Sequence, residues 1–248
     1  MKIIQLIVSL IVFCIGGHAL ANAHAQRVKH RGIEYDVFKI NPPFNHLNIH
    51  WRDRKKDPYL DFHALKIALG KRKRRLIFAC NAGIFAPRFK PLGLHVENYR
   101  TIHPVNHGRG PGNFYVQPNG IFMITRTNRA RIILSKQWNP KKYQARIATQ
   151  SGPMLVINNR IFWKLRSKSP SVYIRNGVGI DSTGAVYFAI SRSPVNMHQF
   201  AHLFRYRLNC PWALYLDGSI SKMYLPRLKR YDSGGPFAAM FSYSLPNR

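Results

Sequence analysis

The chain has 248 residues, and 39 lysines and arginines against 9 aspartates and glutamates give it a formal net charge of +30. Such a charge favours anionic partners and accelerates their encounter, although basic residues spread along the whole chain are also consistent with a role in solubility alone. The length suits one domain with a full core, and past the first apolar run no second stretch is long enough to cross a membrane.

The N-terminal segment has the features of a secretory signal peptide, which we predict for residues 1–25. Lys2 precedes an apolar run over residues 3–15, and small residues allow cleavage after Ala21, Ala23 or Ala25. The run is shorter than the roughly 20 residues of a spanning helix, which favours cleavage over the alternative of an uncleaved anchor. We therefore expect a periplasmic or secreted domain over residues 26–248.

An exported protein meets phosphorylated glycans and lipid headgroups rather than nucleic acid, so the expected partner is an anionic glycan. Cys80 and Cys210 remain after export. In an oxidising compartment they can form a disulfide, and a pair of buried free thiols is the alternative.

Apolar runs of strand length recur along the chain, separated by turn signals. Two segments, 59–69 and 196–208, have the apolar spacing of helices. The second carries His198 and His202 at a metal-ligand spacing, but Gln199 stands where a zincin has glutamate, so we expect an exposed pair without a metal. The pattern predicts an α+β fold: a single compact domain with a mainly antiparallel, curved sheet and a few packed helices. The predicted strands are 33–40, 47–51, 76–80, 92–96, 114–116, 121–125, 131–134, 153–157, 172–174, 185–191 and 213–216.

Polar residues follow apolar runs at four places, where folds commonly hold site residues. At the first, Asn81 carries a donor and an acceptor that suit sugar hydroxyls, and Gly83 lets the chain turn closely. At the second, Ser151 offers a hydroxyl to a phosphate oxygen, and Gly152 lets backbone N–H groups approach a ligand. A plain turn is the structural alternative at both places.

The third place holds Arg175, whose guanidinium can donate two hydrogen bonds to a phosphodiester. Asn176 follows it, and we expect Gly177 and Gly179 to leave room for a ligand beside the strand. A nearby acid, Asp181, is assigned instead to an ordinary hairpin turn.

The fourth place holds Asp217, directly after an apolar run and before the hydroxyls of Ser219 and Ser221. A buried acid is costly unless it has partners. That cost makes Asp217 the best catalytic candidate of the chain, with a structural capping role as the alternative.

Five segments in register along the chain resemble the phosphodiester glycosidase domain family, the family of the uncovering enzyme that acts on N-acetylglucosamine-1-phosphodiesters. Where that family has a glycine pair after its first asparagine and a glycine-rich stretch after its last aspartate, this chain has Ala82-Gly83 and Ser219-Ile220-Ser221. The pattern is closer to bacterial periplasmic relatives, so the reaction class carries over better than the sugar. The five segments are 81–85, 119–120, 150–153, 175–179 and 216–221.

The resemblance implies an enzyme that hydrolyses the sugar–phosphate bond of a glycosyl phosphodiester, and it leaves open a divalent cation such as Ca²⁺ as cofactor. In this hypothesis Arg175 and Ser151 hold the phosphodiester, Asn81 and Asn176 orient the sugar, and Asp217 assists attack at the anomeric carbon. Because glycoside cleavage typically uses two carboxyl groups, Glu97 at the end of the segment Leu-Gly-Leu-His-Val-Glu is the second candidate. The alternative is a non-catalytic envelope protein that binds anionic glycans, for example in exopolysaccharide assembly.

Overall fold

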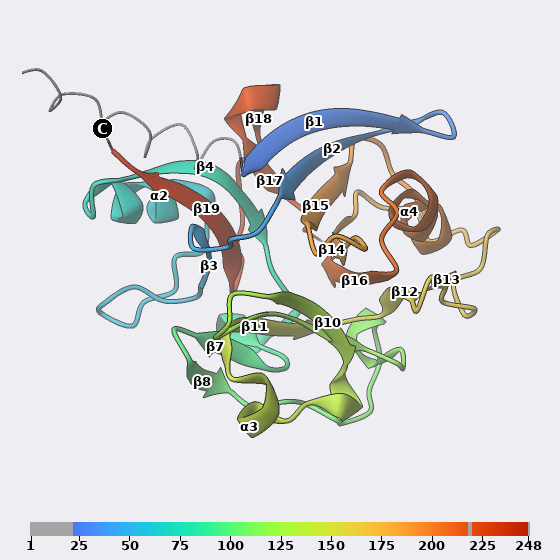
Figure 1. The fold of residues 1–248 in the computed structure, drawn as a ribbon, viewed down its shortest axis with the longest axis horizontal. Helices are drawn as coiled ribbons and strands as arrows, with labels where there is room; N and C mark the ends of the chain where they lie inside the picture. Colours follow the sequence, from blue (N-terminus) through green and yellow to red (C-terminus); the bar gives the residue numbers. More distant parts are fainter. Residues whose placement is uncertain (1–21, 218–219, 248) are drawn as a thin grey trace, which may run out of the picture.

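The computed structural model describes residues 22–217 and 220–247, in which antiparallel sheets predominate and short helices cover their outer faces (Figure 1). This confirms the predicted α+β class. The strands form three main sheets instead of one, and these sheets surround a common core.

The first sheet has seven strands in the order β1-β2-β15-β14-β16-β12-β13. Its central strands β14 and β15 are buried along their whole length, because other sheets cover one face and a helix covers the other. Its strands are β1 (Ala23–His30), β2 (Ile33–Ile40), β12 (Met154–Ile157), β13 (Arg160–Ile161), β14 (Asn176–Ile180), β15 (Val186–Ser191) and β16 (Trp212–Asp217).

The second and third sheets have five strands each, in the orders β10-β9-β11-β7-β8 and β18-β17-β4-β19-β3, and β5 (Phe85–Ala86) pairs only with β6 (Lys90–Pro91). The second sheet consists of β7 (His95–Glu97), β8 (Arg100–His103), β9 (Gly120–Thr125), β10 (Ala130–Leu134) and β11 (Ala145–Ser151). The third consists of β3 (Leu47–His50), β4 (Arg74–Asn81), β17 (Met223–Leu225), β18 (Arg230–Tyr231) and β19 (Met240–Pro246).

Stacked and edge-on aromatic rings fill the space where the three sheets meet. Phe38 of β2 stacks on Phe78 of β4 with ring centroids 4.4 Å apart, and Phe188 of β15 contacts both Phe122 of β9 and Phe241 of β19. Such rings bury large apolar areas and hold neighbouring layers in a defined geometry. This core therefore fixes how the strand ends that carry the predicted site residues face one another.

Helices pack on the outer faces of two sheets (Figure 1). Helix α2 (Phe62–Gly70) covers the third sheet and is capped by Asp61, which accepts from the Ala64 N–H at 2.7 Å. Helix α4 (Met197–His202) covers the first sheet and continues as a π-helical turn over Leu203–Arg207. The segment 197–207 lies within the predicted helix 196–208, and α2 extends one residue beyond the predicted helix 59–69. A short α3 (Pro140–Tyr143) was not predicted.

Two predicted strands are wrong. Residues 113–115 form a short 3₁₀ helix, and of residues 172–174 only Tyr173 forms an isolated bridge, to Val195. The histidine pair of α4 also differs from expectation, because His202 is half-buried and its Nδ1 lies 2.7 Å from Nε2 of His30.

The predicted signal peptide falls mostly on residues 1–21, which lie outside the described residues. Strand β1 begins at Ala23, which is buried opposite Ile40. Cleavage after Ala21 would leave β1 whole, whereas cleavage after Ala25 would remove its first three residues. Among the described residues no helix has the length and hydropathy needed to cross a membrane.

Cys80 and Cys210 are free thiols. Cys80 lies in the central core, and Cys210 lies under α4 on the other side of the first sheet. Burial raises the pKa of both thiols. Of the two alternatives, the structure has the buried free thiols.

Candidate functional site

A buried network of polar side chains forms where β4 and β16 end and β14 begins. It contains Asn81, Asn176, Asp217 and Ser221, each no more than 6% exposed. Asn176 lies directly opposite Asp217 in the antiparallel pair β14–β16, and Asn81 reaches them from the third sheet. Four predicted site residues from three distant segments of the sequence are thus brought together.

The Asn176 amide is the centre of this network. Its Nδ2 donates to the backbone oxygen and to Oδ1 of Asn81, both at 2.9 Å. Its Oδ1 accepts from the Asp217 N–H at 3.0 Å and from the Ser221 hydroxyl at 3.3 Å. All four hydrogen-bonding positions of the amide are therefore satisfied within the protein, so Asn176 is positioned to hold the strand ends together.

The carboxylate of Asp217 is held by an amide from the third sheet. Asn81 Nδ2 donates to Asp217 Oδ2 at 3.2 Å, while Asn81 Oδ1 accepts from the Lys222 N–H at 2.9 Å. The Ser221 hydroxyl accepts from the Asn176 N–H at 3.0 Å and also contacts the Asp217 backbone oxygen. An acid enclosed by such partners keeps one orientation, which a catalytic carboxylate requires.

Replacing Asn176 by alanine is expected to lower the free energy of unfolding by about 3 kcal/mol, because several buried groups lose their partner at once. Urea unfolding followed by circular dichroism measures this effect. Asn113→Ala, at an exposed position in the short 3₁₀ helix 113–115, is the matched control and should change stability by less than about 0.5 kcal/mol. Equal effects of the two substitutions would contradict the central role of Asn176.

Gly83 and Ser151 join the second sheet to this network. A Cβ on Gly83 would lie 2.6 Å from the Gln150 backbone oxygen and 2.8 Å from Thr149 Oγ1, so only glycine allows this approach to β11. The Ser151 hydroxyl donates to the Leu216 backbone oxygen at 2.7 Å. Ser151 is fully buried, so the structure places it as a support for the end of β16, one residue before Asp217.

Gly152 has a packing role in the same region. A Cβ there would lie 2.7 Å from the Asn119 side chain and 3.0 Å from the Phe114 backbone oxygen. Gln150, which was not predicted as a site residue, ties this region to a surface loop: it accepts from the Leu94 and Asn106 N–H groups. Its place at the end of an apolar strand, next to Ser151, is a signal that could have identified it.

Arg175 lies in a different environment from the one predicted. Its side chain is buried, and its guanidinium donates to Val195 O and Ser171 O at 2.7 Å and to the Tyr215 hydroxyl at 2.8 Å. Binding a phosphodiester would require it to give up these buried hydrogen bonds. In the structure Arg175 therefore has a supporting role: its hydrogen bonds fix the segment before β14.

The space beside Gly177 and Gly179 is also filled, contrary to the prediction of room for a ligand. A Cβ on Gly177 would lie 3.0 Å from the ring of Phe200, and one on Gly179 would lie 2.6 Å from the ring of Phe204. The two glycines let the helical segment pack closely on the first sheet. Asp181 has its predicted place in a turn, accepting from the Thr183 and Ala185 N–H groups.

Glu97 is paired with a buried histidine that the sequence analysis did not single out. His95 Nε2 lies 2.6 Å from Glu97 Oε1, and His95 Nδ1 is buried with no hydrogen-bond partner among the described residues. His95 stands opposite Thr149, the residue that contacts the Gly83 turn. The two-residue spacing of His95 and Glu97 in a strand, which puts both on one face, is the signal that could have identified the pair.

His50 lies near this pair, and its Nε2 is 2.8 Å from the Ser242 hydroxyl. Burial is the largest influence on His50 and lowers its pKa to about 4, with Glu97 acting in the opposite direction. In the unfolded chain His50 therefore takes up a proton near pH 6.5, and in the folded chain His50 does so only near pH 4.

We expect this difference to contribute stability that is complete above pH 6.5 and is lost as the pH falls toward 4, by about 3 kcal/mol. Urea unfolding at several pH values measures it. His50→Gln keeps a hydrogen-bonding group without a proton to take up, so its stability should fall less steeply over this range. His63→Gln, at an exposed position, should keep the slope of the unsubstituted protein; an unchanged slope for His50→Gln would contradict the prediction.

Ser219 lies outside the described residues, so its predicted role stays a prediction. Within residues 22–217 and 220–247 no group of three or more histidine, cysteine, aspartate or glutamate side chains is arranged to hold a metal ion. The side chains bonded to Asp217 in the network are amides and a hydroxyl, and we assign no metal ligand to them.

Comparison with known proteins gives relatives over most of the chain. The uncharacterized protein YigE of Escherichia coli (strain K12) is 32% identical over 189 residues, which cover 76% of this chain and 73% of YigE. Among solved structures, the zebrafish N-acetylglucosamine-1-phosphodiester alpha-N-acetylglucosaminidase catalytic domain, auto-inhibited by its pro-peptide, has a similar fold. The TM-score is 0.59 at 13% identity, with 90% of this chain and 82% of that one covered.

A putative exported protein from Burkholderia pseudomallei K96243 also shares the fold, with a TM-score of 0.56 at 11% identity over 86% of this chain and 74% of that one. The family profile described as phosphodiester glycosidase matches residues 74–238. This match begins with β4 and contains every member of the buried network around Asp217. On this match, which spans more than half of the sequence, the chain belongs to the phosphodiester glycosidase family.

Proposed function

We propose that the protein acts in the cell envelope and hydrolyses a glycosyl phosphodiester of the N-acetylglucosamine-1-phosphodiester type. The bond it cleaves joins the anomeric carbon of the sugar to the phosphate. The observation that carries this proposal is the enclosed Asp217 carboxylate, held by Asn81 and supported through Asn176 and Ser221. Membership of the phosphodiester glycosidase family supports the reaction class.

In the proposed reaction a water oxygen becomes bonded to the anomeric carbon, and the bond from that carbon to the phosphate oxygen breaks. The electron pair of that bond goes to the phosphate oxygen. A phosphate monoester is a better leaving group than a sugar alkoxide, so the reaction depends less on a strong general acid. Asp217 assists the attack, either as a base toward water or as the nucleophile of a two-step route.

The positioning of Asp217 accounts for the residues that gather around it. Asn81 fixes the carboxylate, and Asn176 fixes the backbone that carries it. Glu97, paired with His95, stays the candidate for the second carboxyl group. The net charge of +30 favours encounter with an anionic substrate outside the cytoplasm.

The test is release of free sugar from UDP-N-acetylglucosamine, a convenient glycosyl phosphodiester surrogate, by the protein and by Asp217→Asn, each with and without added Ca²⁺. Release by the unsubstituted protein and not by the variant supports the proposal. Full turnover by the variant would exclude Asp217 from the chemistry. If neither releases sugar, a panel of envelope glycan phosphodiesters replaces the surrogate, and no turnover of any of them would reject the enzymatic function.

The second candidate function is an envelope protein that binds anionic glycans without cleaving them, and the excess of 39 basic over 9 acidic residues favours it. This function predicts salt-sensitive binding that Asp217→Asn leaves intact, together with no turnover. The same purified proteins therefore distinguish the two functions.

A further inference from the structure

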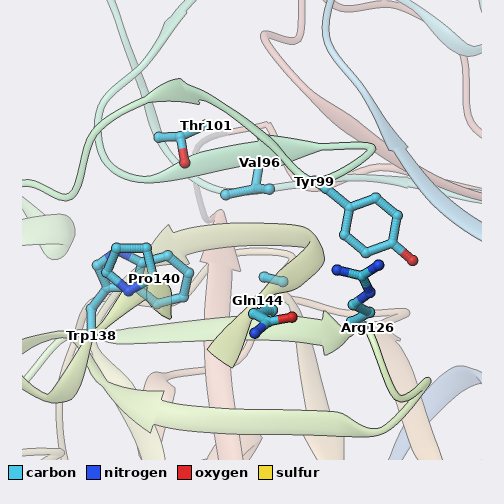
Figure 2. Close-up of a pocket in the computed structure, with 8 residues that line it drawn as sticks. Val96, Tyr99, Thr101, Arg126, Trp138, Pro140 and Gln144 are labelled. Atoms are coloured by element: carbon cyan, nitrogen blue, oxygen red, sulfur yellow. The ribbon is translucent and has the colours of Figure 1, made fainter. Parts of the chain in front are cut away.

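A cavity of about 580 Å³ lies on the second sheet, away from the network around Asp217. Figure 2 shows Trp138 and Pro140 at one side, Tyr99 and Arg126 at the other, and Gln144 between them. Its volume lies within the range of small-molecule sites, which is roughly 300–1,000 Å³. The residues that line it are Val96, Tyr99, Thr101, Arg126, Trp138, Pro140, Gln144 and Ala145.

The cavity and the network lie on opposite faces of the second sheet. Val96 faces the cavity, and its neighbour His95 faces the other way, toward Trp51. Successive residues of a strand point to opposite faces, and Thr149, opposite His95, contacts the Gly83 turn of the network. The cavity is therefore a separate site.

The aromatic side chains of the cavity suit the flat, C–H-rich face of a pyranose ring. Trp138 is half-buried, and the Tyr143 ring lies nearly parallel to it, with an interplanar angle of 13° and centroids 6.0 Å apart. This contact holds the indole in place where it lines the cavity. Tyr99 is 54% exposed and offers a second ring across from it.

The polar side chains of the cavity suit hydroxyls and one anionic group. Gln144 and Thr101 can both donate and accept hydrogen bonds, as sugar hydroxyls require. Arg126 offers a guanidinium that matches a phosphate, and none of the eight described lining residues is acidic. The exposed Lys141 and Lys142 follow the lining residue Pro140 in α3, so the segment beside the cavity is also basic.

We propose that this cavity binds a phosphorylated sugar unit, with the pyranose ring on Trp138 and the phosphate at Arg126. The site is a second recognition site on the face opposite the Asp217 network. It would hold another unit of an anionic glycan, or tether the protein to one. The binding does not depend on hydrolysis and is tested without it.

The four tryptophans give four indole N–H signals in a ¹⁵N-labelled sample, and Trp138→Phe identifies the signal of Trp138. The probe is N-acetylglucosamine 1-phosphate, compared with N-acetylglucosamine and with inorganic phosphate. We expect the 1-phosphate to shift the Trp138 signal strongly. The signal of Trp163, 81% exposed and not among the lining residues, is the internal control and should stay unchanged.

Arg126→Gln should weaken the binding of the 1-phosphate about tenfold and leave the affinity for the uncharged sugar unchanged. Arg129→Gln, an exposed arginine of the same β9–β10 turn that does not line the cavity, is the matched control and should bind as the unsubstituted protein does. Because the Trp138 signal reports this cavity, binding at the Asp217 network leaves it unaffected.

A Trp138 signal that does not move at about 10 mM probe would overturn the proposal, since a site with a Kd of about 1 mM would then be about 90% occupied. Equal binding by Arg126→Gln and the unsubstituted protein would also overturn it. A shift of equal size with inorganic phosphate alone would reject the sugar and leave only an anion site.

Discussion

Replacing Asp217 by asparagine is expected to lower kcat for a glycosyl phosphodiester by about 10²–10⁴-fold, the range typical of losing a positioned acid or base. Asparagine has nearly the same shape and can accept from Asn81, but it can neither take a proton from water nor attack the anomeric carbon at a useful rate. Steady-state assays of sugar release from UDP-N-acetylglucosamine, or from the substrate that the panel identifies, measure the effect.

The same substitution should change stability little, by about 1 kcal/mol, because the hydrogen bond from Asn81 can be kept. Thermal unfolding of the variant therefore separates lost chemistry from lost structure. Asp57→Asn, at an exposed position, is the matched control and should retain full activity. A variant that is folded and fully active would show that Asp217 has only a structural role.

Replacing Asp36 by asparagine is expected to lower the free energy of unfolding by about 3 kcal/mol. The Asp36 side chain is fully buried and accepts from Arg192 at 2.8 Å, from Arg230 at 3.0 Å and from Arg27 at 3.3 Å. Asparagine would leave these guanidinium groups without their shared countercharge. Arg27 and Arg192 can turn toward water, which keeps the loss below that of a fully enclosed cluster.

This cluster links β1 and β2 of the first sheet to β18 of the third, so the loss should appear as lower cooperative stability of the whole domain. Urea unfolding measures it. Glu34→Gln is the matched control, because Glu34 is half-exposed and 3.7 Å from Arg192, and a pair of this kind contributes about 0.5 kcal/mol or less. Similar losses for the two substitutions would refute the role assigned to Asp36.

The sequence pattern predicted about half of the described strands, those in which an apolar run is bounded by turn residues. Strand β2 has the predicted bounds, and β4, β9, β10 and β16 differ by one or two residues at one or both ends. Strands β1, β11, β14 and β19 are among those missed. Strand β19 shows why. It lies between β4 and β3 and places Met240 opposite both Asn81 and His50, a long-range pairing that local patterns do not contain.

In the candidate site, too, local sequence patterns predicted single residues and long-range packing decided how they are combined. Polar residues after apolar runs predicted Asn81, Asn176, Asp217 and Ser221 separately, and the structure joins them. The prediction for Arg175 differs because neighbouring strand residues point to opposite faces. Its side chain is held by Val195 and Tyr215 on the side covered by α4, whereas Asn176 faces Asn81.

The sequence by itself predicted the fold class, about half of the strands, the positive charge and Asp217 as the candidate catalytic acid. These features depend on residue type and on short-range spacing. The tertiary structure decided which polar groups become hydrogen-bond partners. Asn176, Ser151 and Arg175 support neighbouring backbone segments, and His95 pairs with Glu97. It also formed the cavity beside Trp138 from β7, β8 and β11, the turns beside them and helix α3. Such partnerships depend on which strands become neighbours and on which face each side chain takes, and both are settled only when the three sheets pack on one core.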